Sequence, residues 1–207
     1  MPIEEKIRQL AQKYAQELAR KIDARMMEMQ ADDKSHFLIY QVLGIGAEEG
    51  ELIDNYQNKG RFLYKYAGTF LEDAAMLCFK ERFPEAARFR VENTMGRRPK
   101  QFEIDCLIET DAIEIKWHDA TTDGDHITKE HTRIQVIKQH GFKPVRLMFY
   151  QPNREQAIKI QATLRTLYHG IDGEYYAQEE AWNYLKERTN IDLKKILTEI
   201  SATIGTP

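Results

Sequence analysis

The sequence predicts an α/β (α+β) fold, in which a mixed central sheet is flanked by helices and followed by a helical C-terminal part. In most of the chain, apolar residues recur every three or four positions, as on the buried face of a helix. Between residues 88 and 150 the period changes, and apolar and polar residues alternate over 102–109 and 112–117, which is typical of strands. With 207 residues, 42% of them hydrophobic, the chain can bury one sizeable core, so we expect a single domain, 1–207.

The N-terminal part, residues 1–52, is expected to be helical. Its first element is an amphipathic helix over residues 3–26, which must cover either its own domain or a partner such as a second subunit. A second helix is expected over 37–45, before a stretch of glycines and acids. A longer helix is expected over 53–83, because Pro84 discourages helix immediately before it.

The middle of the chain is expected to contain a β-hairpin, a helix and a further strand. Residues 102–108 and 112–117 alternate as strands, 123–140 read as a helix, and 144–150 read as a buried strand. The C-terminal part, 153–204, is expected to be helical, with helices near 154–168, 175–188 and 191–203.

The hairpin carries the most informative residues. An acid followed two positions later by Lys occurs at several places, but only Glu114 and Lys116 lie on a predicted strand that follows an acid, Asp105, on another apolar strand. If Thr110 and Asp111 form the turn, Asp105 faces Lys116 and lies diagonal to Glu114 at about 7–8 Å. The opposite face then turns toward the core, with Ile104, Cys106, Ile113, Ile115 and Trp117.

These three residue types suit phosphodiester hydrolysis. Carboxylate oxygens of Asp105 and Glu114 are the hard ligands that Mg²⁺ prefers. Lys116 is a compact cation that can polarise an attacking water or stabilise charge on the phosphate. The alternative is a cross-strand salt bridge on a solvated face of the sheet.

An acid on one strand, a closely following strand with Glu-x-Lys and a helix upstream resemble the signature of PD-(D/E)xK nucleases. The resemblance covers roughly residues 60–150, and Ile104 replaces the usual Pro before the acid. It implies a restriction-endonuclease-like fold, catalytic roles for Asp105, Glu114 and Lys116, and Mg²⁺ held at Asp105, Glu114 and Ile115. Members often carry one more acid on the preceding helix. Glu72 matches that position, and its place on the helix fits an ordinary surface residue equally well.

Within this superfamily, the short chain without an ATPase or helicase motif most resembles type II restriction endonucleases. This implies a homodimer that cuts double-stranded DNA at a palindromic site, with the dimer contact among the N-terminal helix and the helices after residue 153. One alternative is a structure-selective or DNA-repair nuclease of the same fold. Another is a DNA-binding protein without catalytic activity.

Any DNA contact requires a local basic surface, because the net charge of the chain is −3. The segment from residue 88 to 101 has an excess of basic residues, and we assign Arg97, Arg98 and Lys100 in its loop to DNA binding.

The helix over 123–140 offers a second candidate DNA contact. It places His126, Lys129 and Arg133 on one polar face, which could follow DNA or simply face solvent. The acids and histidines from His118 to His126 match no zinc or EF-hand spacing, which favours a polar loop over a metal site.

Two cysteines cannot form a disulfide framework, and neither lies at zinc-knuckle spacing. The charged N-terminus and the lack of a long apolar run predict neither a signal peptide nor a membrane span. We therefore expect a cytoplasmic protein that does not bind membranes.

Overall fold

The computed structural model describes residues 1–96, 98–118 and 124–204, although not the side chains of 124–126 and 204. The chain forms two compact units. One consists of Arg8–Phe70, and the other consists of Met1–Ile7 together with Leu71–Pro207. Cys78 and Cys106 are free and buried, as expected for a chain without disulfides.

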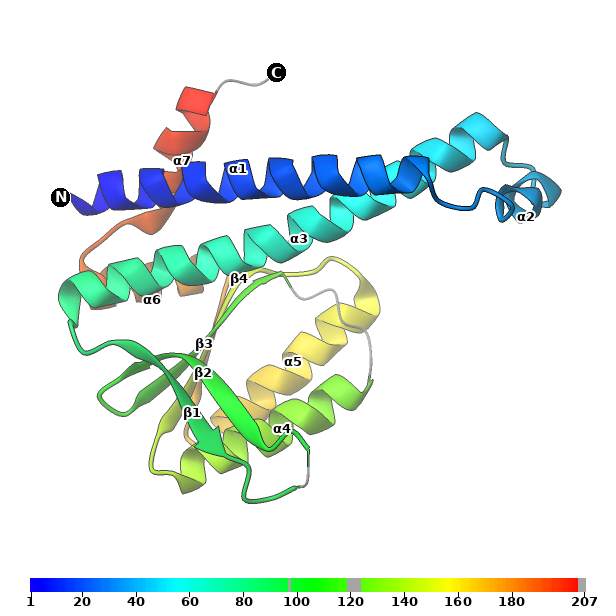
Figure 1. Ribbon diagram of the computed structural model, residues 1–207. Coiled ribbons are helices and arrows are strands. Elements are labelled where there is room, and N and C mark those ends of the chain that lie inside the picture. Colours follow the sequence, from blue (N-terminus) through cyan, green and yellow to red (C-terminus); the bar gives the residue numbers. More distant parts are fainter. Residues whose placement is uncertain (97, 119–123, 205–207) are drawn as a thin grey trace. The chain divides into compact units, whose positions relative to one another are not determined.

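The larger unit is built on a five-stranded mixed sheet, which confirms the predicted fold class (Figure 1). The strands are β1 (Ala87–Glu92), β2 (Gln101–Ile108), β3 (Asp111–His118), β4 (Lys143–Tyr150) and β5 (Glu174–Ala177). They lie in the order β1-β2-β3-β4-β5, with antiparallel pairing from β1 to β3 and parallel pairing from β3 to β5. The strand nearest the middle of the order, β3, carries Glu114 and Lys116.

Helices cover both faces of this sheet (Figure 1). They are α4 (Gly124–Gln139), α5 (Glu155–His169), α6 (Glu179–Thr189) and α7 (Leu193–Ile204). On β4, Met148 packs with Ile134 of α4 and Leu164 of α5, whereas the next residue, Phe149, stacks against Trp182 of α6 at 4.3 Å between ring centroids. Successive strand residues point to opposite faces, so α4 and α5 cover one face and α6 covers the other. Helix α7 packs against α6.

The Arg8–Phe70 unit contains most of α1 (Ile3–Gln30), all of α2 (Phe37–Val42) and the first part of α3 (Ala47–Arg82). Tyr14 packs edge-on against Tyr66 and Phe70, with ring centroids 6.1 and 5.7 Å apart. The predicted N-terminal and second helices are thus confirmed.

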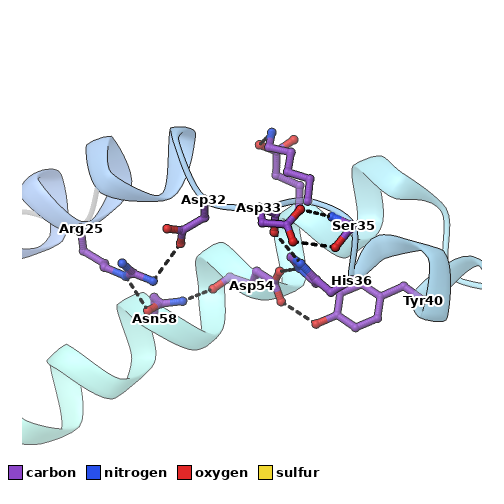
Figure 2. A network of polar contacts seen from close by, with 10 residues as sticks. Arg25, Asp32, Asp33, Ser35, His36, Tyr40, Asp54 and Asn58 are labelled. Atoms are coloured by element: carbon purple, nitrogen blue, oxygen red, sulfur yellow. Dashed lines mark hydrogen bonds and ion pairs between the residues drawn. The ribbon is translucent and has the colours of Figure 1, made fainter.

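Asp54 of α3 holds α2 in place (Figure 2). Its two carboxylate oxygens meet His36 Nε2 and the hydroxyl of Tyr40, each at 2.9 Å. Hydrogen bonding to Asp54 is the main cause that raises the pKa of His36. This contact explains how a helix of only six residues stays ordered against its neighbour.

Helix α3 begins earlier than the sequence predicted, at Ala47 rather than near residue 53. Gly50 favoured a helix end, yet it lies inside the helix and is buried. A β-carbon at this position would come within 2.7 Å of the Tyr40 ring. The glycine therefore serves the close packing of α2 on α3 rather than a helix end.

Strands β1 and β5 were not predicted from the sequence. Residues 175–177 were expected to start a helix but belong to β5, and α6 begins only at Glu179. β5 is four residues long, too short to show a period of two. The helices predicted near 154–168 and 191–203 are confirmed as α5 and α7.

Candidate active site

The turn between β2 and β3 sets the positions of the candidate residues. Ile108 pairs with Asp111 and Cys106 with Ile113, so the turn is Glu109-Thr110 rather than Thr110-Asp111. The predicted register is therefore wrong by two residues. Glu109 adopts a φ of 52°, and tight two-residue hairpin turns need such a left-handed residue.

A shift of two residues preserves which side chains share a face. Continued by one residue, the observed register brings Asp105 opposite Glu114, closer than the predicted diagonal. Ile104, Cys106, Ile113 and Ile115 are fully buried, as predicted, whereas Trp117 is only half-buried. Ile104 nevertheless packs with Ala112 and with residues of α4, because β2 carries an irregularity where its pairing with β1 shifts register.

The two strands separate where the candidate residues lie. Backbone pairing between β2 and β3 extends from the turn to Cys106 and Ile113. Beyond it, the N–H of Ile115 donates to Oδ2 of Asp105 at 2.8 Å, and the carbonyl of Glu103 accepts from Nη2 of Arg133 at 2.7 Å. Side chains thus take over hydrogen bonds that a continuous ladder would supply.

Cations surround Glu114 on this face. Its Oε1 lies 2.6 Å from Nζ of Lys116, and its Oε2 accepts a hydrogen bond from Arg133. Arg146 of β4 is its neighbour in the parallel register. The Glu114 side chain is only 9% exposed, so these charges act on it through little water.

The environment sets the two carboxyl groups apart. Burial, together with the nearby Glu114 charge, raises the pKa of Asp105 to about 7 against the opposing effect of Lys116. Burial also acts to raise the pKa of Glu114, but Arg133, Lys116 and Arg146 outweigh it and lower that pKa to about 2. The pKa of Lys116 is raised because Glu114 and Asp105 outweigh its burial.

Glu72 lies on α3 in the same unit as the sheet and is half-buried. Burial is the main cause that raises its pKa, and the charges of Lys116 and Glu114 act on it as well. Glu72 is therefore near the cluster electrostatically, as the superfamily resemblance implies for a further acid.

The carboxylates of Asp105 and Glu114 are the donor pair available to a metal. Within the described ranges, no group of three or more His, Cys, Asp or Glu side chains is placed to hold a metal ion. Hard carboxylate oxygens of this kind fit Mg²⁺ rather than Zn²⁺. Of the polar loop from His118 to His126, residues 119–123 lie outside the described part of the chain.

The candidate DNA-binding residues divide into exposed and buried groups. Arg98, Lys100 and Lys129 are exposed. Arg97 lies outside the described residues, and so does the side chain of His126.

Part of the expected basic surface is neutralised. Arg88 lies 2.8 Å from Asp73, and Arg90 lies 2.7 Å from Glu103. The positive charge available to a polyanion is therefore smaller than a count along the sequence suggests. Exposed ion pairs of this kind contribute little to the stability of the fold.

The exposed position expected for Arg133 is wrong, because its side chain is buried against Glu114. Glu130, Arg146 and Tyr168 join it in a buried network that sequence reasoning missed. A signal existed in Arg146, the one charged residue in the otherwise apolar run from Pro144 to Tyr150. Glu130 likewise lies on the same helical stripe as Ile134, a core residue.

A family model described as ApaLI-like restriction endonuclease matches residues 1–202. A comparison with curated proteins finds no match. None of the helices in the described part of the chain is both long and apolar enough to cross a bilayer.

Proposed function

We propose a chemistry for a chain that belongs to the ApaLI-like restriction endonuclease family: hydrolysis of phosphodiester bonds in duplex DNA at Asp105, Glu114 and Lys116. Membership makes the chain a nuclease of the restriction endonuclease type, which agrees with the resemblance to restriction endonucleases. The use of Mg²⁺, the catalytic residues and the PD-(D/E)xK chemistry are our proposal.

One observation supports this assignment most strongly. Asp105 and Glu114 come together where β2 and β3 separate, and the two carboxyl groups have pKa values of about 7 and about 2. A salt bridge that serves only stability would lower the pKa of its acid. A carboxyl group with a raised pKa, buried beside another carboxylate, is typical of a site that binds a cation.

In the proposed reaction, a water oxygen attacks the phosphorus, the bond to one sugar oxygen breaks, and a phosphate and a hydroxyl end remain. Lys116, which is 33% exposed, holds the water or stabilises negative charge on the phosphate. The carboxylates of Asp105 and Glu114, together with the main chain of Ile115, would hold Mg²⁺. The ion would supply Lewis-acid stabilisation of the charge that develops on the phosphate.

Cleavage of unmethylated phage DNA in MgCl₂ tests this proposal. We expect Asp105→Ala and Glu114→Ala to abolish cutting while DNA binding persists. Glu103→Ala is the matched control, since Glu103 is an exposed carboxylate on the same strand as Asp105 and should cut normally. A folded Asp105→Ala or Glu114→Ala variant that cuts at the wild-type rate would reject the site.

The form of the products separates the remaining alternatives. Discrete fragments indicate a site-specific restriction enzyme, and sequenced fragment ends would give the site. Nicks that depend on DNA structure indicate a repair nuclease of the same fold. Binding without any metal-dependent cutting indicates a DNA-binding protein without catalytic activity.

We also propose that the enzyme is a homodimer on a palindromic site, because one Asp105/Glu114/Lys116 centre cuts one strand and a duplex has two. Apolar side chains that are more than half exposed gather on α2 and early α3: Leu38, Ile39, Val42, Leu43, Leu52 and Tyr56. At roughly 100 Å² each they reach about 600 Å², the upper end for a monomer and most of the ~800 Å² per partner of a standard interface. We therefore propose this surface as the contact with the second copy, in place of the N-terminal helix and the helices after residue 153 that the sequence suggested.

A further inference from the structure

A network of charged side chains lies inside the fold next to Glu114. Glu130 and Arg133 lie one turn apart on α4, Arg146 lies on β4, Tyr168 lies on α5, and all four are buried. Oε1 of Glu130 accepts from Arg133 and Arg146 at 3.3 Å each, and from the hydroxyl of Tyr168 at 2.6 Å. The network thus joins two helices and a strand around one carboxylate oxygen.

Packing alone does not account for these charges. Taking ions out of water is costly, and apolar side chains of similar volume often stabilise a core as well or better. The same helix supplies such side chains at Ile134 and Ile137, both buried in the core. What distinguishes the position of Arg133 is its contact with Glu114.

Arg133 connects the two strands of the candidate site. Its Nη2 donates to Oε2 of Glu114 on β3 and, at 2.7 Å, to the carbonyl of Glu103 on β2. Its Nη1 donates to Glu130 on its own helix. One guanidinium therefore spans the place where the strands separate, and its planar geometry fixes all three directions at once.

The two cations on Glu114 differ in accessibility. The side chain of Arg133 is 9% exposed, whereas that of Lys116 is 33% exposed. Oε2 of Glu114 is thus held from inside the fold, while Oε1 meets the more accessible partner.

We propose that Arg133, held by Glu130, is a positioning residue that fixes Oε2 of Glu114 and thereby directs Oε1 toward Lys116 and the metal. This inference rests on the proposed function, because it assigns Glu114 to the metal. Arg133 acts through Glu114 and does not itself contact DNA. It is therefore reassigned from the DNA-binding group expected from the sequence.

Calorimetric titration of the metal-free protein with MgCl₂ tests this role. Arg133→Lys keeps the buried positive charge but cannot make all three contacts, so a change reports on orientation rather than charge. We expect Mg²⁺ affinity to fall about 10- to 100-fold, as for other partners that orient metal ligands. Arg165→Lys, an exposed site on α5 paired with Glu180, is the matched control and should bind as wild type does.

Three outcomes would overturn the inference. The first is a wild-type Mg²⁺ affinity in Arg133→Lys, and the second is an equal loss of affinity in Arg165→Lys. The third is that Glu114→Gln does not reduce the Mg²⁺ binding of the wild-type protein, or that the wild-type protein binds no Mg²⁺. Thermal unfolding verifies that each variant is folded. If Arg133→Lys does not fold, Glu130→Gln replaces it, because it loosens Arg133 while leaving the Arg133–Glu114 contact, and wild-type affinity there equally rejects the role.

Single-turnover cleavage separates positioning from a general structural effect. If Arg133 acts by orienting the metal ligand Glu114, the half-saturating MgCl₂ concentration should rise about 10- to 100-fold in Arg133→Lys, while the rate at saturating MgCl₂ stays within about twofold of wild type. A tenfold or larger loss of rate that persists at saturating MgCl₂ would overturn the inference. A wild-type protein that binds Mg²⁺ but does not cut DNA would refute the proposed function, whereas the calorimetry would still decide the role of Arg133.

Discussion

Asp105→Asn should make the protein more stable at neutral pH while abolishing its proposed activity. The folded protein raises the pKa of Asp105 from 3.8 to about 7, mainly through burial. Ionising this side chain is therefore harder in the folded than in the unfolded chain. Asn removes the charge, and its side-chain carbonyl can still accept the N–H of Ile115.

The size of the effect follows from proton linkage. Each tenfold change in proton affinity is worth about 1.4 kcal/mol, so a pKa raised from 3.8 to about 7 lowers the free energy of unfolding by about 4 kcal/mol once Asp105 is ionised. Well below pH 3.8 the group is protonated in both states, and this loss is absent. The advantage of Asp105→Asn should grow from about pH 4 to about pH 7 and stay constant above it.

Urea unfolding of both proteins between pH 4 and pH 9 in EDTA measures this difference. Asp192→Asn is a control of opposite sign, because a hydrogen bond from Lys186 lowers the pKa of Asp192. The ionised Asp192 side chain stabilises the fold above its unfolded pKa, and this contribution is lost as pH falls through its folded pKa. Asp192→Asn should therefore be less stable than wild type at neutral pH. MgCl₂ should then stabilise the wild type and leave Asp105→Asn unchanged. An Asp105→Asn variant that is less stable than wild type at pH 8, or a difference independent of pH, would refute the reasoning.

Four further outcomes are expected. Lys116→Ala should lose at least about 10²-fold in cleavage rate with undiminished Mg²⁺ affinity in calorimetry, and a collapse of metal binding instead would reverse the role of Lys116. Glu72→Gln should slow cleavage more than tenfold, since Lys116 acts on its charge, and a smaller effect would mark a surface residue. Replacing both Arg98 and Lys100 with Ala should reduce the slope of log DNA affinity against log salt by about 2 if both contact phosphates, and an unchanged slope would remove them from the interface. Light scattering should give about twice 24.3 kDa for the wild type and 24.3 kDa for Leu38→Asp, whose exposed position leaves the monomer intact, whereas a wild-type mass of 24.3 kDa with and without DNA would reject the homodimer.

The fold class could be predicted because its signals are local. Alternation on β2 and β3 and the long apolar stripes of the helices depend only on neighbouring residues. The register depended on the backbone of Glu109, whose left-handed conformation the sequence does not announce. The slip of two residues moves the expected partner of Asp105 from Lys116 to Glu114, and the irregularity of β2 beside Asp105 was a second feature that alternation alone does not reveal.

Arg133 shows where local reasoning ends. A helical projection places it beside Lys129, and from the sequence both look like solvent-facing cations. Only the tertiary structure reveals that β3 presents an acid, Glu114, directly to this part of α4. Arg146, the one charge in the apolar run from Pro144 to Tyr150, indicated a buried ionic network, since a charge on a covered strand needs a buried partner.

The two carboxyl groups of the candidate site differ in the charges and hydrogen bonds that surround them. Glu114 has three nearby cations and stays ionised, whereas at Asp105 the Lys116 charge and the backbone N–H do not outweigh burial beside another acid, so its pKa is raised. Pairs of titratable groups whose surroundings drive their pKa values apart are a recurrent property of sites that act on bonds. Here the excess of unfavourable negative charge lies at Asp105. A divalent cation bound between Asp105 and Glu114 would offset this negative charge and, at the same position, would bind a phosphate oxygen.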